Sequence, residues 1–315
     1  MSIVVFAGPT LRQEEVKARL DAVVLGPAAF GDVYRAAHSR PTAIAIIDGY
    51  FERVPAIWHK EILWAMSEGV HVFGASSMGA LRAAELYDFG MVGVGSIFEA
   101  FRDGTLEDDD EVAVAHGQAD TGFLPVSEAM VNIRATLERA AREGVAAADS
   151  CARLVQLAKH TFYAQRCYPT LFEAAQADGV PAAELARLRS WLREGGRVDQ
   201  KRRDAEQLLE HLQRWQQQQP GPLRVSYAFE QTDAWHEAQR IATKAMTPEA
   251  QSDDQGVLDE LKLTGAYAAA RATAEARGWS LEAARRAGVR PDALSVRTAV
   301  ETFRRNRGLL ERQAF

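Results

Sequence analysis

The first hundred residues alternate between two hydrophobic patterns, and this alternation constrains the fold more than any other feature of the chain. Four short runs rich in β-branched residues end at or near a glycine, as strands buried on both faces do: IVVFAG (3–8), AVVLG (22–26), AIAIIDG (43–49) and VHVFGA (70–75). Apolar residues at helical spacing fill the segments between them, 10–20, 28–39 and 54–69. Strands joined by crossover helices lie parallel, so we expect a three-layer α/β core of the Rossmann or flavodoxin type.

The sequence changes character after residue 135. Ala, Leu, Arg, Glu and Gln dominate there, in runs such as EAMVNIRATLERAAREG and DAEQLLEHLQRWQQQQ. These compositions are typical of helices, and a chain of 315 residues is long enough for two domains. We therefore predict an α/β core domain over residues 1–135 and a mostly α-helical C-terminal domain over residues 136–315.

Charge and cysteine content exclude several classes of function. The formal net charge is −6 and the pI about 5.7, which argues against general binding to a nucleic-acid backbone. Cys151 and Cys167 are the only cysteines, so neither a disulfide framework nor a structural zinc site is expected. The N-terminal stretch lacks a basic start with a long apolar core, and no apolar run approaches the roughly 18 residues of a membrane span. We expect a cytoplasmic protein without a membrane partner.

Three segments with polar residues follow the predicted strands directly. They are GPT (8–10) after the first strand, DGYFE (48–52) after the third and GASSMG (74–79) after the fourth. Ligands of open parallel sheets bind at the carboxyl edge of the strands, where loops lead into helices. We therefore expect Gly8, Pro9, Thr10, Asp48 and the two serines of the third segment to meet in space.

The serine turn has two interpretations. Around Ser77, the stretch ASSMG has the small-x-Ser-x-Gly spacing of a nucleophile elbow, although its first residue is Ala instead of Gly. A helix that begins there also directs free amides and a positive dipole end at the site. Alternatively, Ser76 caps the helix, and the small residues after it only allow close packing against the sheet. Spacing alone favours the second interpretation.

A nucleophilic serine needs a base, and the sequence offers several. His59 and Lys60 lie near the start of the helix after the third strand, while His116 follows the acidic run EDDDE (107–111). Asp48 could orient a base or bind a polar substrate, or it could simply form a turn before Gly49. A bare acidic run is usually a solvated loop, so we propose no metal site.

The same segments resemble a known family. GPT, the stretch DGYFERVPAIWHKEILWAMSEGVHVFGASSMGALRAAEL, the following YDFGMVGVGSIFEAFRDGTLEDDDEVAVAHG and the later SEAMVNIR are similar to the core domain of TfuA-like proteins, over roughly residues 3–135. The resemblance implies a partner of YcaO enzymes, which activate a peptide amide with ATP and Mg. It implies a hydrolase that releases sulfide from the thiocarboxylate of a ThiS-like carrier protein, for thioamide formation on a ribosomal precursor peptide. No cofactor of its own is implied.

With this resemblance, the two interpretations of the turn change order. Ser77 becomes the preferred nucleophile, with Ser76 as its competitor, His59 or Lys60 as base, His116 as the alternative base and Asp48 as the orienting group. Amides of the helix start and of Gly8 or Thr10 would stabilise the oxyanion. Arg82 and Glu85, one helical turn apart, either pair with each other or hold the tail of the carrier.

Two other classes of function stay open. The helical half could serve a non-catalytic adaptor that binds the YcaO enzyme and positions its peptide. The sheet edge alone is also compatible with a small-molecule or nucleotide-binding domain, although GPT lacks the glycines and lysine of a phosphate-binding loop. The sequence leaves the oligomeric state open.

Overall fold

The computed structural model describes residues 2–50, 54–117 and 122–244, together with residues 268, 271–273, 279–280, 282–283 and 286–288. The chain divides into two compact units, Met1–Ala242 and Thr243–Phe315. The described residues of the second unit lie in short helical or turn segments. The first unit holds the sheet and every predicted site residue.

Five parallel strands form one sheet with the order β2-β1-β3-β4-β5. Their bounds are β1 (Ile3–Phe6), β2 (Val23–Leu25), β3 (Ala43–Ile46), β4 (His71–Ala75) and β5 (Val92–Val94). The predicted α/β class with a parallel sheet is therefore confirmed. The strand order reverses between β1 and β3, so the loops after these two strands leave a crevice of the kind in which doubly wound sheets bind ligands.

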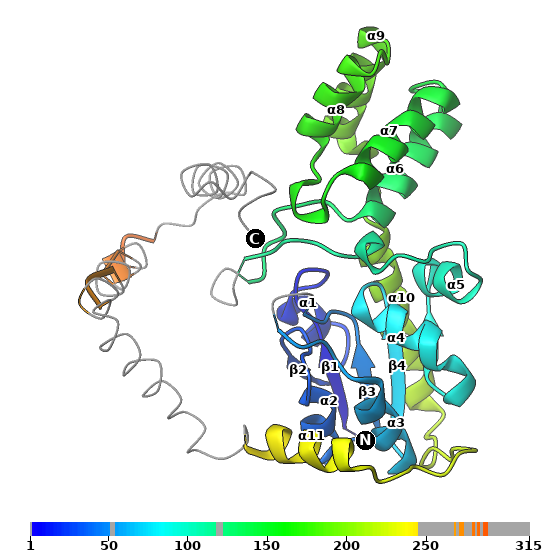
Figure 1. The fold of residues 1–315 in the computed structure, drawn as a ribbon, viewed down its shortest axis with the longest axis vertical. Helices are drawn as coiled ribbons and strands as arrows, with labels where there is room; N and C mark the ends of the chain where they lie inside the picture. The colour runs from blue at the N-terminus through cyan, green and yellow to red at the C-terminus, as the bar shows by residue number, and fades with distance from the viewer. Residues whose placement is uncertain are drawn as a thin grey trace. The chain divides into compact units, whose positions relative to one another are not determined.

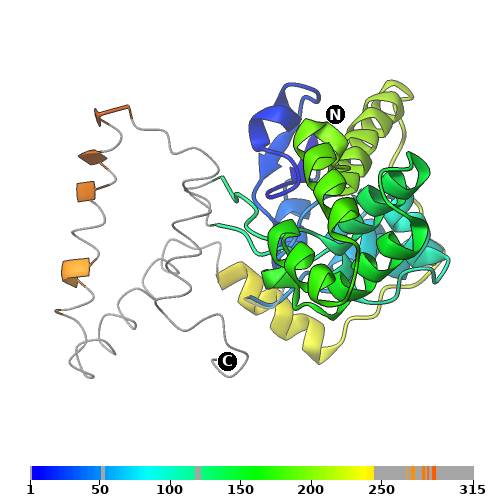
Figure 2. The same cartoon turned by 90° about the horizontal axis from the view of Figure 1, so that it is seen from above.

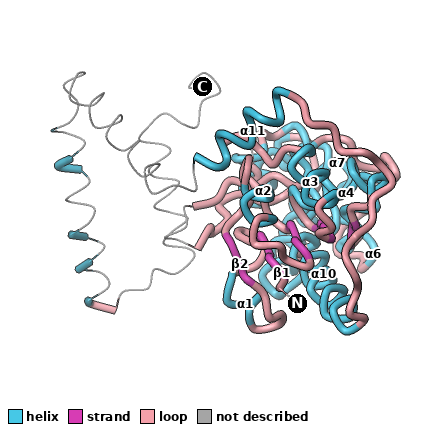
Figure 3. Tube along the Cα trace, turned by 90° about the horizontal axis from the view of Figure 1, so that it is seen from below, coloured by secondary structure: helices cyan, strands magenta, loops and turns pink. Residues whose placement is uncertain are grey.

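Helices cover both faces of the sheet, which makes three layers (Figures 1 and 3). One face packs against α2 (Asp32–Ala37), α3 (His59–Ser67), α4 (Met78–Leu86) and α5 (Ser96–Arg102). The other face packs against α1 (Gln13–Lys17) and α10 (Gln200–Gln217). Both faces are apolar because side chains alternate along β3. Ile44 and Ile46 pack on the face covered by α2 to α5, whereas Ala43 and Ala45 pack on the face covered by α1 and α10.

Four helices pack around a core of their own at one end of this unit (Figures 1 and 2). They are α6 (Met130–Arg142), α7 (Ala148–His160), α8 (Tyr168–Ala177) and α9 (Ala182–Trp191). Helix α10 returns from this group to the sheet, so the α/β core includes a helix from the segment that the sequence assigned to the helical domain. The predicted boundary after residue 135 lies inside α6.

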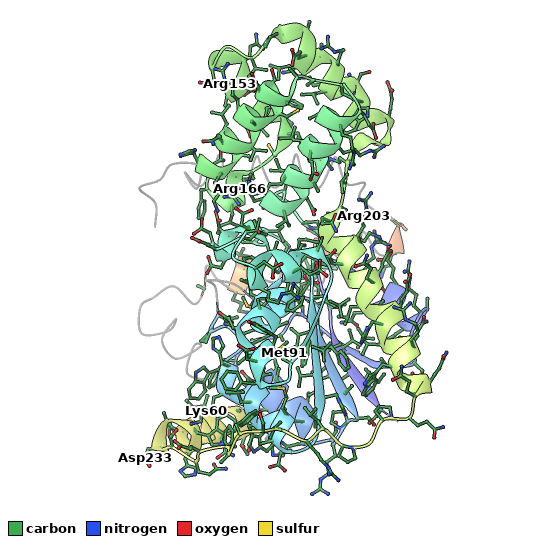
Figure 4. The ribbon with its side chains drawn as sticks, turned by 90° about the vertical axis from the view of Figure 1, so that its right-hand side faces the viewer. Lys60, Met91, Arg153, Arg166, Arg203 and Asp233 are labelled. Atoms are coloured by element: carbon green, nitrogen blue, oxygen red, sulfur yellow. The ribbon has the colours of Figure 1, made fainter. Side chains whose placement is uncertain are left out.

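The acidic run matches the predicted solvated loop only in its first three residues, which are exposed. Cations of the helical group bind its last two residues, Asp110 and Glu111. Arg166 is almost fully buried and donates both to the carbonyl oxygen and to the carboxylate of Asp110. Lys159 pairs with the same carboxylate, and Arg134 forms two hydrogen bonds, of 2.8 and 2.9 Å, with the buried carboxylate of Glu111. Figure 4 shows Arg166 in the lower part of the helical group, and these contacts fix the chain just before residue 112.

The last described helix of the first unit, α11 (Asp233–Lys244), packs against α2 and α3. Its buried Trp235 contacts the rings of Tyr34 and Trp64. Among the described residues, no helix combines the length and the apolar character that crossing a bilayer requires.

Candidate active site

The chain passes from β4 into α4 through a tight turn of two serines. Ser76 has a φ of 70°, in the left-handed region that residues other than glycine seldom adopt, and the Ser77 amide donates to the Ala75 carbonyl oxygen at 2.8 Å. A Cβ at Gly79 would lie 1.7 Å from the Ile46 carbonyl oxygen, so only glycine allows α4 to pack this closely. The turn therefore stores backbone strain at the carboxyl edge of the sheet, as functional sites often do.

Ser77, and not Ser76, occupies the N-cap position of α4, and its side chain makes no capping hydrogen bond. The predicted alternative of a capping Ser76 is therefore wrong. The Ser77 hydroxyl oxygen instead lies 3.0 Å from Nζ of Lys201, which also donates to the Val112 carbonyl oxygen at 2.7 Å. A side chain from α10 thus meets the serine that follows β4.

Lys201 is buried, with 4% of its surface exposed, and Ser77 is buried beside it with 8% exposed. Burial lowers the pKa of the Lys201 amine below its ordinary value of 10.5, although the nearby carboxylates of Asp48, Asp199 and Glu128 act in the opposite direction. An amine with a lowered pKa, in contact with a serine hydroxyl, can accept the proton of that hydroxyl. This arrangement is the serine–lysine variant of nucleophile and base.

Asp48 organises the other side of the turn. Its buried carboxylate accepts hydrogen bonds from the Gly8 amide at 2.8 Å, from the Thr10 amide at 3.0 Å and from the Thr10 hydroxyl at 2.6 Å. The Ser76 hydroxyl lies 3.5 Å from the Thr10 hydroxyl. The expected convergence of the strand ends after β1, β3 and β4 is present, and Pro9 lies in the same loop.

One predicted role at this edge does not match the geometry. The amides of Gly8 and Thr10 already donate to Asp48, so they are not available to an oxyanion. The Thr10 hydroxyl also donates to Asp48. The buried carboxylate thus takes up the donors that the sequence assigned to an oxyanion.

The Met78 amide is a better donor for an oxyanion. It belongs to the residue directly after Ser77 and begins α4, where the helix dipole adds positive potential. Among the hydrogen bonds of the described residues, none engages this amide. Its position directly after Ser77 makes it a candidate donor for the oxyanion that forms when the Ser77 oxygen attacks a carbonyl carbon.

The three bases predicted from the sequence lie elsewhere. His59 forms a 2.7 Å contact with Glu85 on the surface. The Lys60 amine donates to the Thr232 hydroxyl at 3.0 Å, beside the segment that leads into α11 (Figure 4). His116 makes a 2.7 Å hydrogen bond with the Gly117 carbonyl oxygen. The side chain in contact with Ser77 is Lys201, which the sequence analysis did not include.

Arg82 and Glu85 pair with each other, as expected from their spacing. An Arg82 guanidinium nitrogen lies 2.7 Å from the Glu85 carboxylate, and Arg82 also donates to the Ile57 carbonyl oxygen at 2.9 Å. Because His59 contacts the same carboxylate, these residues link α3 to α4. Their polar groups are engaged within the chain.

Comparison with known families now adds to this geometry. Residues 48–167 match the family described as TfuA-like protein. This chain contains a TfuA-like domain. The matched segment begins at Asp48 and includes the Ser76–Ser77 turn, but it lacks β1 and Lys201. It ends further along the chain than the resemblance seen in the sequence. No curated protein matches the chain.

TfuA-like proteins are associated with YcaO enzymes, and the domain supports a role related to YcaO-associated thioamide biosynthesis. In this chain the TfuA-like domain supplies Ser77, and α10, which follows the domain, supplies Lys201. The complete site therefore needs residues beyond the matched segment.

Proposed function

We propose that this chain is a serine-type hydrolase that releases sulfide from the C-terminal thiocarboxylate of a ThiS-like carrier protein and delivers it to a YcaO enzyme. The observation that carries the proposal is the buried contact of 3.0 Å between the Ser77 hydroxyl and the Lys201 amine. The TfuA-like domain supports the connection with YcaO-dependent thioamide formation, and the precursor peptide is then an indirect partner. ATP and Mg belong to the partner's reaction.

The acylation step follows from the protonation states. Neutral Lys201 accepts the Ser77 proton while the serine oxygen attacks the thiocarboxylate carbon. Lys201 then returns that proton to the sulfur, which leaves as HS⁻, and an ester between the carrier and Ser77 remains. Sulfide is a good leaving group, and the Lys201 ammonium next to the tetrahedral intermediate stabilises its negative charge.

Hydrolysis of the ester completes the cycle. Lys201 accepts a proton from a water molecule that attacks the ester carbon, and it returns the proton to the departing Ser77 oxygen. The carrier leaves with an ordinary carboxylate. The Met78 amide would stabilise the oxyanion in both steps, because both place negative charge on the same carbonyl oxygen.

The restricted access to the site favours a narrow substrate end. Ser77 is 8% exposed and Ser76 is fully buried, so only a slender group reaches the hydroxyl. The extended C-terminal tail of a small carrier protein has this form. The burial also strengthens the electrostatic contacts inside the site.

The test is sulfide release from a thiocarboxylated carrier, measured in a single turnover with the full chain. We expect Ser77→Ala to abolish the acyl-enzyme and Lys201→Met to lower the rate by roughly 10²- to 10⁴-fold. Lys201→Arg should be as inactive as Lys201→Met, because a guanidinium keeps the charge but does not accept the proton. Ser76→Ala, with a smaller effect, is the matched control.

Release that is unchanged in Ser77→Ala would refute serine chemistry. If that variant also supports thioamide formation by the YcaO enzyme, while a variant that no longer binds the enzyme does not, the chain acts as an adaptor. A hydrolase and an adaptor are thus separated by two substitutions and one binding measurement.

A further inference from the structure

Behind Lys201 lies a side-chain amide with all of its polar groups engaged. Asn132, in the first turn of α6, is 7% exposed. Its Oδ1 accepts a hydrogen bond from the Lys201 backbone amide at 3.1 Å. Its Nδ2 donates to Asp199 at 3.1 Å and to Glu128 at 3.2 Å. The orientation of the amide is determined, because the reverse orientation would place its oxygen against two carboxylates.

These contacts act on the two properties of Lys201 that matter for a base. The first is position: the bond to the Lys201 backbone fixes the first turn of α10, from which the side chain reaches Ser77. The second is charge: Asp199 and Glu128 are two of the three carboxylates that favour the charged amine, and the Asn132 amide donates to both.

We propose that Asn132 is a positioning residue, which places Lys201 against Ser77. By donating hydrogen bonds to Asp199 and Glu128, it also weakens the attraction of these carboxylates for the charged amine, so that Lys201 can serve as base. This inference rests on the proposed serine–lysine chemistry, and it assigns to the TfuA-like domain a second contribution besides the nucleophile.

Other charged side chains also act on this network. The carboxylate of Asp48, which follows β3, favours the charged form of the Lys201 amine. Arg197 lies 3.2 Å from the second carboxylate oxygen of Glu128 and partly balances it. Asp199 also accepts the Arg202 backbone amide as the N-cap of α10. Of these groups, Asn132 alone contacts both carboxylates and the backbone of Lys201.

The neighbouring turn of α6 offers a matched control. Thr136 is fully buried, accepts the Val198 amide at 3.0 Å and lies 3.3 Å from the Val198 carbonyl oxygen. It therefore ties α6 to the segment before α10, as Asn132 does, but it touches neither Lys201 nor the two carboxylates. Thr136→Val removes comparable bonds between the same elements without altering the charges near the amine.

The probe is a fluorophosphonate with a slender alkyl chain, which fits the restricted access to Ser77. It phosphonylates an activated serine with loss of fluoride and needs no knowledge of the natural substrate. Its rate of reaction with Ser77 is measured against pH on the full chain, and the labelled residue is identified by mass spectrometry. The rate follows the fraction of neutral Lys201, so the midpoint of the profile reports the titration of the amine in the folded protein.

Three variants are compared with the wild type. Asn132→Asp places a third carboxylate in the network, and we expect the midpoint to rise by roughly one pH unit, with about a tenfold slower reaction below it. Asp199→Asn keeps a good N-cap and removes a carboxylate, so the midpoint should fall. Thr136→Val should keep the wild-type midpoint, with a rate within about twofold, while it lowers the urea concentration at which the protein unfolds.

Profiles of Asn132→Asp and Asp199→Asn that superimpose on that of the wild type would overturn the inference, as would an equal shift in Thr136→Val. Because Asp199→Asn retains the helix cap, the test survives even if Asn132→Asp fails to fold. Sulfide release is measured in parallel. If the midpoint rises in Asn132→Asp and falls in Asp199→Asn but no sulfide is released, the proposed substrate is refuted and the role of Asn132 stands. If Ser77 is not labelled at any pH, both the proposed function and the role of Asn132 are refuted.

Discussion

Replacing Lys201 by methionine separates the catalytic role of the amine from its contribution to stability. Methionine has a similar length and no charge, so it can occupy the same buried space beside Ser77. The substitution removes the hydrogen bonds to the Ser77 hydroxyl and to the Val112 carbonyl oxygen. It also removes an amine whose burial lowers its pKa, and that lowering has a measurable consequence for folding.

The sign of this consequence follows from proton binding. In the unfolded chain the Lys201 amine titrates near 10.5, and in the native protein its pKa lies lower because the charged form is desolvated. Between these two values the unfolded chain binds more protons than the native protein, so the free energy of unfolding rises with pH. The maximum slope for one amine is about 1.4 kcal/mol per pH unit. Lys201→Met lacks this contribution altogether.

The assay is urea unfolding of the full chain, followed by circular dichroism at pH values from about 7 to about 10.5. We expect the free energy of unfolding of the wild type, minus that of Lys201→Met, to increase with pH over this range. Ser77→Ala keeps the amine and should therefore retain the rise. A difference that is flat or that falls with pH would refute the reasoning, because the native amine would then not be destabilised in its charged form.

Three further predictions concern other parts of the fold. Glu61 is buried and accepts four backbone amides, at 2.8 to 3.2 Å, so Glu61→Gln should lower the free energy of unfolding by about 2–4 kcal/mol in denaturant melts. Gly79→Ala should yield little folded protein on size-exclusion chromatography, since its Cβ would overlap the Ile46 carbonyl oxygen, and a normal yield would contradict that packing. His59→Gln should release sulfide within about twofold of the wild-type rate, because His59 contacts Glu85 on the surface and not Ser77; a much slower release would restore His59 as a candidate base.

The strand-end residues of the site could be predicted from the sequence because of a topological rule. Thr10, Asp48 and Ser76 each follow a strand of one parallel sheet, and parallel strands end at the same edge. Their hydrogen-bonded contacts in the structure follow from that rule alone. The rule does not predict which donor binds which acceptor. The amides of Gly8 and Thr10 are therefore assigned to an oxyanion from the sequence, whereas in the structure they donate to the Asp48 carboxylate.

The base could not be chosen in the same way. His59 and Lys60 begin the helix after β3, but a long connection separates Ile46, the last residue of β3, from that helix. The start of α3 is therefore not held at the sheet edge, and its side chains contact Glu85 and Thr232. A residue that follows a strand can be expected at the edge of the sheet only when a short connection joins it to that strand.

A signal for Lys201 does exist in the sequence, within the helical pattern of α10. Ala205, Leu208 and Leu212 form the buried stripe of that helix, and the spacing of the stripe, continued backward, places Lys201 on the same face. The run QKRRDAE hides this position, because lysine in a charged segment normally faces solvent. A charged residue in register with an apolar stripe is the feature to look for.

The same stripe explains how the protein tolerates a buried amine. Leu208, Leu209 and Leu212 are at most 1% exposed against the sheet, and the burial of each leucine contributes about 1.5–3 kcal/mol. This burial, roughly 5–9 kcal/mol in total, acts against the cost of desolvating the Lys201 amine. The packing that attaches α10 to the sheet therefore also removes Lys201 from water. This burial favours the neutral amine, and the same packing places the amine within reach of Ser77. Loss of α10 packing should for this reason impair the reactivity of Ser77 before it unfolds the sheet.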